Sequence, residues 1–149
     1  MAPKNAFENY QKCLDLYRIT NDNTGLSELH ILIADEYLKS NEIDGAFSSY
    51  KDAYQLAINN NQWKSIKQSS LGLSKIYERK DEYDSSLVYL KTYARYNDSI
   101  IKKQMSDELY NLQTHFLRSI SEKELKIKDS DIELLESEKK ISNLQQSFL

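Results

Sequence analysis

The stretch ADEYLKSNEIDGAFSSY, residues 34–50, combines small residues, tyrosines and a short polar break. Forty residues later the chain reads SKIYERKDEYDSSLVYL, residues 74–90, with the same kinds of residue in the same order. The pattern also extends upstream, because AFENY at 6–10 matches AFSSY at 46–50. Self-similarity at this period is typical of stacked helical hairpins. Each unit therefore holds two amphipathic segments, which we call A and B.

Polar breaks rich in Asn and Asp separate the amphipathic segments, and such residues cap helices and tolerate turn conformations. Between the breaks, apolar residues recur at three- and four-residue steps. We therefore expect B helices over 4–19, 43–59 and 83–97, and A helices over 25–40 and 63–80. A last A-type helix is expected to begin near residue 99 and to meet no further turn.

Small residues recur where the two helices of each predicted hairpin would cross, as Ala34 with Ala46 and Ser74 with Ser86. A large side chain at a crossing would push the helix axes apart, and a flanking tyrosine can fill the space beside it. Four tyrosines occupy such repeat positions and are expected in the core: Tyr10, Tyr37, Tyr50 and Tyr77. Three others fit the repeat less well and are freer to be exposed: Tyr89, Tyr96 and Tyr110.

Composition narrows the class of protein. Only three Gly and one Pro occur in 149 residues, too few for the turns of an all-β fold, so the sequence predicts an all-α chain. The net charge of −3 disfavours binding of nucleic acid or of an anionic membrane. No apolar run is long enough to span a bilayer, and residues 1–10 lack the apolar core of a signal peptide. With Cys13 as its one cysteine, the chain can form no intrachain disulfide.

The repeated positions resemble those of the tetratricopeptide repeat (TPR). They are His30, Ile33, Ala34, Tyr37, Ala46, Tyr50 and Ala53 in one copy, and Ser70, Leu73, Ser74, Tyr77, Ser86, Leu90 and Tyr93 in the next. The resemblance covers roughly residues 3–118 and implies a TPR-like α-solenoid of stacked antiparallel helix pairs. The unit is about forty residues rather than thirty-four, Ala and Ser replace the usual Gly, and the closing Pro is missing. The resemblance therefore implies a variant with longer helices.

After repeats over 1–98, residues 99–149 form a second predicted region. One helical face first carries Ile101, Met105, Leu109, Leu112, Phe116 and Ile120. Every seventh residue then continues it as a predicted coiled-coil seam: Ile120, Ile127, Leu134, Ile141 and Phe148. The complementary seam positions are polar, so only half of the usual apolar knobs are present. The sequence leaves open a weak two-stranded coil, a single solvated helix, or a helix packed on its own repeats, where its first part would cap the solenoid.

The stretch YNDSIIKKQMSDELYNLQTHFLRSISEKELKIKDSDIELLESE, residues 96–138, resembles the end of the TPR sensor region in Bacteroidetes signalling proteins. The matching motifs are a turn at Asp98, Ser99 and Ile100, and a helix with Leu112, Gln113, Thr114 and Phe116. In that family a charged coil leads into a membrane span and a histidine kinase or helix-turn-helix output domain. The resemblance, together with a first B helix that has no A partner before it, implies an excised sensor or dimerisation region that meets a membrane only through missing flanking segments. A homodimer through the C-terminal helix is one of the possibilities that the sequence leaves open.

The residues offer little for catalysis. No HExxH, CxxC, GxSxG or glycine-rich phosphate loop occurs, so we expect no enzyme activity, no cofactor and no metal site. His30 occupies the position of a large core residue and His115 flanks the apolar stripe, so structural roles are expected for both. Cys13 aligns with Ala53, which predicts inert packing at a small buried position. Trp63 is expected to join two repeats rather than to bind a ligand.

The A helices of a TPR solenoid line its concave surface, which suits an extended peptide or a partner helix. Carried over by the resemblance, the groove-facing residues are Glu28, Ile31, Asp35, Leu38, Lys39, Gln68, Leu71, Lys75, Glu78, Arg79, Tyr110, Thr114, Leu117 and Arg118. Chaperone-binding members of the family clamp a terminal carboxylate with Lys and Asn, where this chain has Ile31 and Asp35. A chaperone-tail clamp is therefore not expected.

Two functions remain open at this stage. The first is a non-catalytic protein- or peptide-binding module of a bacterial signal-transduction protein, in which groove occupancy alters the pairing of the 99–149 helix. The second is a passive interaction scaffold or assembly factor without switching. The compartment is left open between the extracytoplasmic part of a membrane-anchored protein and the cytoplasm.

Overall fold

The computed structural model describes residues 4–147, with side chains described for residues 7–146, and all of its regular elements there are helices. The helices are α1 Lys4–Ile19, α2 Asn23–Lys39, α3 Ile43–Asn59, α4 Trp63–Arg79 and α5 Tyr83–Ser147. The predicted all-α class is confirmed, and the first four helices begin and end within two residues of their predicted bounds. The chain divides into two compact units, one up to Lys102 and one from Lys103 onward.

The four breaks between helices are each three residues long and share one backbone conformation. Their left-handed residues are Asn21, Asn41, Asn61 and Asp81, with φ of 53°, 59°, 53° and 58°. Asn and Asp tolerate this region because their short polar side chains can form local hydrogen bonds. The next residue closes one helix and begins another: Gln62 N donates to Ala57 O at 2.9 Å, and Gln62 O accepts from Ile66 N at 2.9 Å. This Schellman ending therefore recurs every twenty residues.

The predicted helix end at residue 97 is wrong, because α5 continues through it to Ser147. The resemblance to the sensor family implied a turn at Asp98, Ser99 and Ile100, and all three residues are helical. The twenty-residue spacing puts the next left-handed position at residue 101, and Asn97 and Asp98 come about one helical turn too early. Residue 101 is Ile, which is β-branched and strongly disfavours a left-handed backbone. The helix therefore continues where the repeat would turn.

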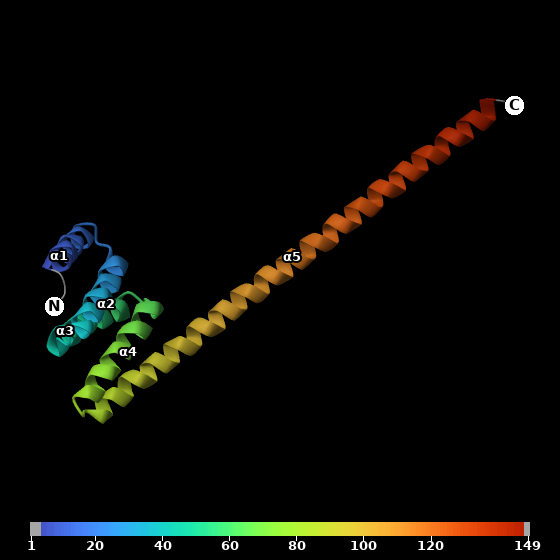
Figure 1. Cartoon of the computed structure of the whole chain (residues 1–149). Coiled ribbons are helices and arrows are strands. Elements are labelled where there is room, and N and C mark those ends of the chain that lie inside the picture. The colour runs from blue at the N-terminus through green and yellow to red at the C-terminus, as the bar shows by residue number, and fades with distance from the viewer. Residues whose placement is uncertain (1–3, 148–149) are drawn as a thin grey trace. The chain divides into compact units, whose positions relative to one another are not determined.

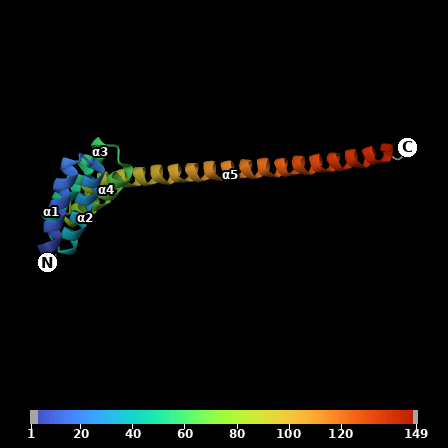
Figure 2. The same cartoon turned by 90° about the horizontal axis from the view of Figure 1, so that it is seen from above.

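Within the first unit, α1 packs on α2, α2 on α3, and α3 on α4, and Figures 1 and 2 show these four helices gathered together. The predicted small residues lie between successive helices. Ala34 and Ala46 belong to one core cluster and are fully buried. The hydroxyls of Ser74 and Ser86 are 3.1 Å apart, and Ser86 Oγ also donates to Ser74 O at 2.9 Å. Small side chains thus allow the close approach of both helix pairs.

Aromatic contacts repeat with the same forty-residue period. The ring centroids of Phe7 and Tyr37 are 4.9 Å apart, and those of Phe47 and Tyr77 are 5.5 Å apart. Of the tyrosines expected in the core, Tyr50 is 4% exposed, and the other three are half-buried. The expectation that Tyr89 is freer to be exposed is wrong: its ring stacks on that of Tyr77 with centroids 5.5 Å apart. Tyr96 is half-buried beside the Trp63 ring, at a centroid distance of 6.5 Å.

Cys13 is exposed, so its predicted buried position is also wrong. Its repeat counterpart Ala53 is fully buried in the core formed by α2, α3 and α4. Among the described helices α1 packs on α2 alone, and this leaves the outward side of α1 uncovered. The alignment with Ala53 failed because α3 packs on both α2 and α4, whereas α1 packs on α2 alone among the described helices.

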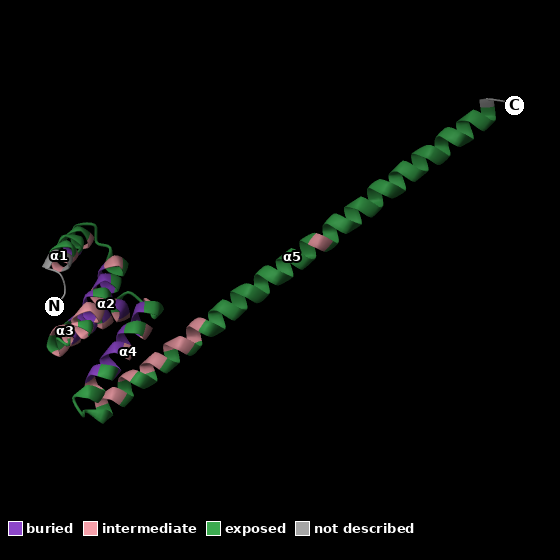
Figure 3. Ribbon diagram, in the orientation of Figure 1, coloured by how far each residue is buried: buried purple, intermediate pink, exposed green. Residues whose placement is uncertain are grey.

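The second unit consists of the rest of α5, and Figure 3 draws nearly all of it in the colour of exposed residues. Ile120 is 38% exposed, and the remaining described seam residues Ile127, Leu134 and Ile141 are 57% to 61% exposed. The seam residue Phe148 lies outside the described residues. No helix in the described part of the chain has the length and apolarity needed to cross a bilayer.

Candidate functional site

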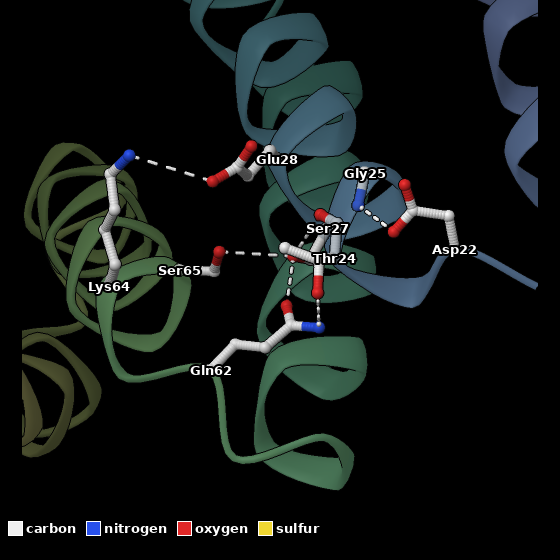
Figure 4. A network of polar contacts seen from close by, with 8 residues as sticks. All are labelled: Asp22, Thr24, Gly25, Ser27, Glu28, Gln62, Lys64 and Ser65. Carbon is white, nitrogen blue, oxygen red and sulfur yellow. Dashed lines mark hydrogen bonds and ion pairs between the residues drawn. The ribbon is translucent and has the colours of Figure 1, made fainter.

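A polar network joins the beginnings of α2 and α4 (Figure 4). Ser27 Oγ donates to Gln62 Oε1 and lies 3.1 Å from Ser65 Oγ, while Gln62 Nε2 donates to Thr24 Oγ1 at 3.1 Å. Ser27 and Ser65 are almost completely buried, so these hydrogen bonds satisfy hydroxyls that would be costly to bury alone. The network therefore holds the first turn of α4 beside that of α2.

Two further contacts flank the network in Figure 4. Asp22 Oδ1 accepts a hydrogen bond from Gly25 N at 2.8 Å and thereby caps α2. Lys64 Nζ lies 3.7 Å from Glu28 Oε1, and both side chains are largely exposed. Such a surface ion pair adds little stability. It does place one charge of each sign at the edge of the two helices.

Two adjoining hollows lie between α2 and α4, and we call them together the α2/α4 groove. One, of about 200 Å³, is lined by Glu28, Ile31, Leu32, Asp35, Lys64 and Gln68. The other, of about 240 Å³, is lined by Ile31, Asp35, Leu38, Tyr50, Gln68, Leu71, Gly72 and Lys75. Glu28 and Lys64 line one hollow, and Leu38 and Lys75 line the other, so α2 and α4 run side by side in the same direction.

The floor of the groove is a fixed polar contact between α2 and α3. Tyr50 Oη donates a hydrogen bond to Asp35 Oδ1. Burial, followed by this hydrogen bond, raises the pKa of Tyr50 well above its ordinary value, so the phenol stays protonated and continues to donate. The Tyr50 ring lies against Gly72 of α4, where an added Cβ would be 2.5 Å from Cε1. Three helices thereby fix the position of the Asp35 carboxylate.

The structure brings seven of the predicted groove residues together along this groove: Glu28, Ile31, Asp35, Leu38, Gln68, Leu71 and Lys75. Lys39, Glu78 and Arg79 lie at the carboxyl ends of their helices and do not line either hollow. Lys39 instead pairs with Glu36 at 2.6 Å, and this hydrogen bond raises the Lys39 pKa. The last four predicted residues are exposed parts of the second unit, so their contribution to a groove stays a prediction: Tyr110, Thr114, Leu117 and Arg118.

Sequence reasoning missed four lining residues: Leu32, Tyr50, Lys64 and Gly72. Tyr50 was expected only in the core, and nothing in its repeat counterpart Leu90 could point to a hydroxyl at the groove. Gly72 was the available signal, because a glycine within a predicted helix often marks a close approach.

Neither histidine lies in the groove lining. His30 is half-buried on α2, and burial lowers its pKa, opposed by the nearby Asp52 charge. His115 is exposed in the second unit. Among the described residues, no group of three or more His, Cys, Asp or Glu side chains could hold a metal ion.

No protein-family model matches the sequence, and comparison with curated proteins and with solved structures finds no significant similarity to either.

Proposed function

We propose that this chain is a non-catalytic, TPR-like module that binds an extended peptide or a partner helix in the α2/α4 groove. The observation that carries the proposal is the groove itself, because two equivalent helices of successive repeats face it with apolar and charged side chains. Helix pairs that recur every forty residues, with small residues between them, support the solenoid interpretation.

The chemistry of the groove favours a segment with an apolar side chain between polar or charged neighbours. Ile31, Leu38 and Leu71 offer apolar surface, and Asp35 and Lys75 offer opposite charges on facing helices. The Asp35 carboxylate is already oriented by Tyr50, so binding a donor there requires little reorganisation. An extended peptide can use the apolar contact for affinity and the two charges for register.

We further propose that the chain is the sensor or dimerisation region of a larger bacterial signal-transduction protein. Its seam over Ile120–Ile141 remains exposed in the single chain, and a half-apolar seam is suited to an interaction that a ligand can bias. In the alternative, a passive scaffold, ligand binding leaves self-association unchanged. Sedimentation velocity with and without a groove ligand separates the two, since only the sensor changes its association state.

The groove is tested with a displayed library of random twelve-residue peptides selected on the wild-type chain. Affinities of the selected peptides are then measured by fluorescence anisotropy for wild type, Leu71→Arg and Lys75→Glu. Lys12→Glu is the matched control, because Lys12 is an exposed lysine on α1, away from the groove. Each groove variant should weaken binding about tenfold or more, and the control should bind like wild type.

Selected peptides that bind both groove variants as tightly as wild type would place the binding site elsewhere on the chain. Repeated failure to select any peptide above the background of a boiled sample would also count against the proposal. Circular dichroism of each variant must first show native helix content, so that lost binding is not lost folding.

A further inference from the structure

The first part of α5, within the first unit, has an apolar face that its own repeat leaves uncovered. Leu87 and Leu90 are 49% and 44% exposed. Their counterparts forty residues earlier, Phe47 and Tyr50, are half-buried and buried. α5 meets α4 through a different set of residues, Ser86, Tyr89 and Tyr96. The face that α4 covers on α3 is thus open on α5.

The contacts between α3 and α4 show which residues would cover this face. Phe47 contacts Tyr77, and the Tyr50 ring lies against Gly72. Adding the forty-residue period to each contact pairs Leu87 with Leu117, and Leu90 with Leu112. The segment from 103 to 119 therefore stands in the position of the next A helix, and three of its apolar residues, Leu109, Leu112 and Phe116, are 64% to 68% exposed.

The turn that would bring residues 103–119 back onto this face is absent from the helix. Each hairpin of the first unit turns at a left-handed Asn or Asp, and the corresponding position holds Ile101 inside a continuous α5. A continuous helix cannot return along its own side, so the 83–101 face needs a helix from another molecule. A second copy of the chain carries the same A-type segment, residues 103–119, and can therefore supply this helix.

We propose that two copies of the chain associate through α5, with residues 103–119 of each copy covering the 83–101 face of the other. The pairing is antiparallel and reciprocal, with Leu90 of each copy against the partner's Leu112 and Ile101 near the two-fold axis. Such a closed, self-complementary contact is the usual form of a homodimer interface. It continues the α3/α4 packing of the first unit and is independent of what binds in the α2/α4 groove.

The apolar surface available is sufficient for a dimer of modest strength. Six side chains per copy, Leu87, Leu90, Met105, Leu109, Leu112 and Phe116, are 44% to 68% exposed. With about 100 Å² for each fully exposed apolar side chain, two copies would bury roughly 700 Å² of apolar surface. A small but specific interface of about 1,200 Å² contains roughly this much apolar area.

Disulfide trapping tests the pairing directly. In a Cys13→Ser background, Leu90→Cys with Leu112→Cys should give a covalent dimer on a non-reducing gel under mild oxidation. Each single-cysteine variant should give far less, because Leu90 pairs with Leu112 and not with itself. A bridge within one chain would show that the segment folds back on its own copy and would overturn the proposal. So would a wild-type chain that sediments as a monomer at its highest soluble concentration.

A matched pair of charge variants separates this interface from a parallel coil through the seam residues. Leu112→Glu should raise the dimer dissociation constant at least about 30-fold, the effect of a central interface residue. Leu134→Glu changes a similarly exposed leucine of the seam and should have little effect on this dimer, because the half-apolar seam associates more weakly than the 83–119 face. If Leu134→Glu weakened the dimer more than Leu112→Glu did, the dimer would form through the seam and our pairing would be refuted. An equimolar mixture of Leu90→Lys and Leu112→Glu chains should recover association, and native circular dichroism of each variant excludes unfolding.

Discussion

Replacing Gly72 with Ala tests whether Tyr50 is fixed as the groove geometry requires. A Cβ at residue 72 would lie 2.5 Å from Tyr50 Cε1 and 2.6 Å from Cε2, well inside van der Waals contact. The ring cannot move aside easily, because Tyr50 is 4% exposed and its hydroxyl is bound to Asp35. The added methyl group must therefore displace α4 or break the contact with Asp35.

Three contributions set the expected size of the effect. Ala is a better helix residue than Gly by about 1 kcal/mol, which favours the variant. Overpacking a filled core costs about 1–3 kcal/mol, and losing a hydrogen bond to a charged group costs about 1.5–3 kcal/mol. We expect a net loss of about 2 kcal/mol in the free energy of unfolding, because helix propensity offsets only part of the cost. For a unit of this size the melting temperature should fall by roughly 8–16 °C.

The assay is urea unfolding followed by the fluorescence of Trp63, the one tryptophan of the chain, which lies at the start of α4. The sharper comparison is a double-mutant cycle with Tyr50→Leu. Without the aromatic ring, Gly72→Ala should be neutral or should stabilise by up to about 1 kcal/mol. If Gly72→Ala changed the unfolding free energy equally in both backgrounds, the contact between residue 72 and Tyr50 would not be the cause of the lost stability.

Four further predictions concern stability and association. Burial raises the pKa of Tyr50 above its ordinary value of 10.0, so the stability contributed by the protonated phenol is complete below pH 10 and is lost as the pH rises further. Tyr50→Phe should therefore reduce the decline in unfolding free energy that is measured above pH 10. Asn61 has φ of 53°, so Asn61→Ala should destabilise by about 1 kcal/mol in urea titrations, whereas Asn61→Gly should not. Ser70 Oγ is buried without a hydrogen-bond partner among the described residues, so Ser70→Ala should raise the unfolding free energy by about 1 kcal/mol. A variant less stable than wild type would show that the Ser70 hydroxyl does have a partner. Ile101→Asn with Lys102→Asp should install a further turn and convert dimers to monomers in sedimentation velocity, while Ile101→Val should leave the dimer intact.

Most of the helical boundaries could be predicted because one local rule governs them. Asn or Asp recurs at every twentieth residue from 21 to 81, between segments with helical periodicity, and the structure places a left-handed residue at each of these positions. The turn that the resemblance implied at Asp98, Ser99 and Ile100 is wrong, because α5 is helical there. These residues also lie before the position at which the twenty-residue spacing would turn the chain. The twenty-residue spacing alone would also have failed, because it places the next turn at Ile101, where α5 continues.

The groove was predicted in part because lining positions follow from which side of a helix faces its repeat neighbour. Ile31 and Leu71, forty residues apart, follow this rule, and both line the groove. Tyr50 comes from a B helix, and only the packing of three helices brings its hydroxyl to Asp35. Cys13 is exposed because α1 packs on α2 alone among the described helices, whereas its counterpart Ala53 lies on a helix that packs on both α2 and α4.

After residue 100 the hydrophobic pattern and the residue at the expected turn position predict different structures. The hydrophobic pattern continues the repeat, since Leu109 and Leu112 stand where an A helix would pack. The turn chemistry does not, since Ile101 replaces the left-handed Asn or Asp. A single molecule without a turn at Ile101 leaves Leu109 and Leu112 without the packing that the hydrophobic pattern predicts. Both leucines are indeed exposed. A helix from a second copy satisfies both the hydrophobic pattern and the turn chemistry at once, because it covers the open face without any turn at Ile101.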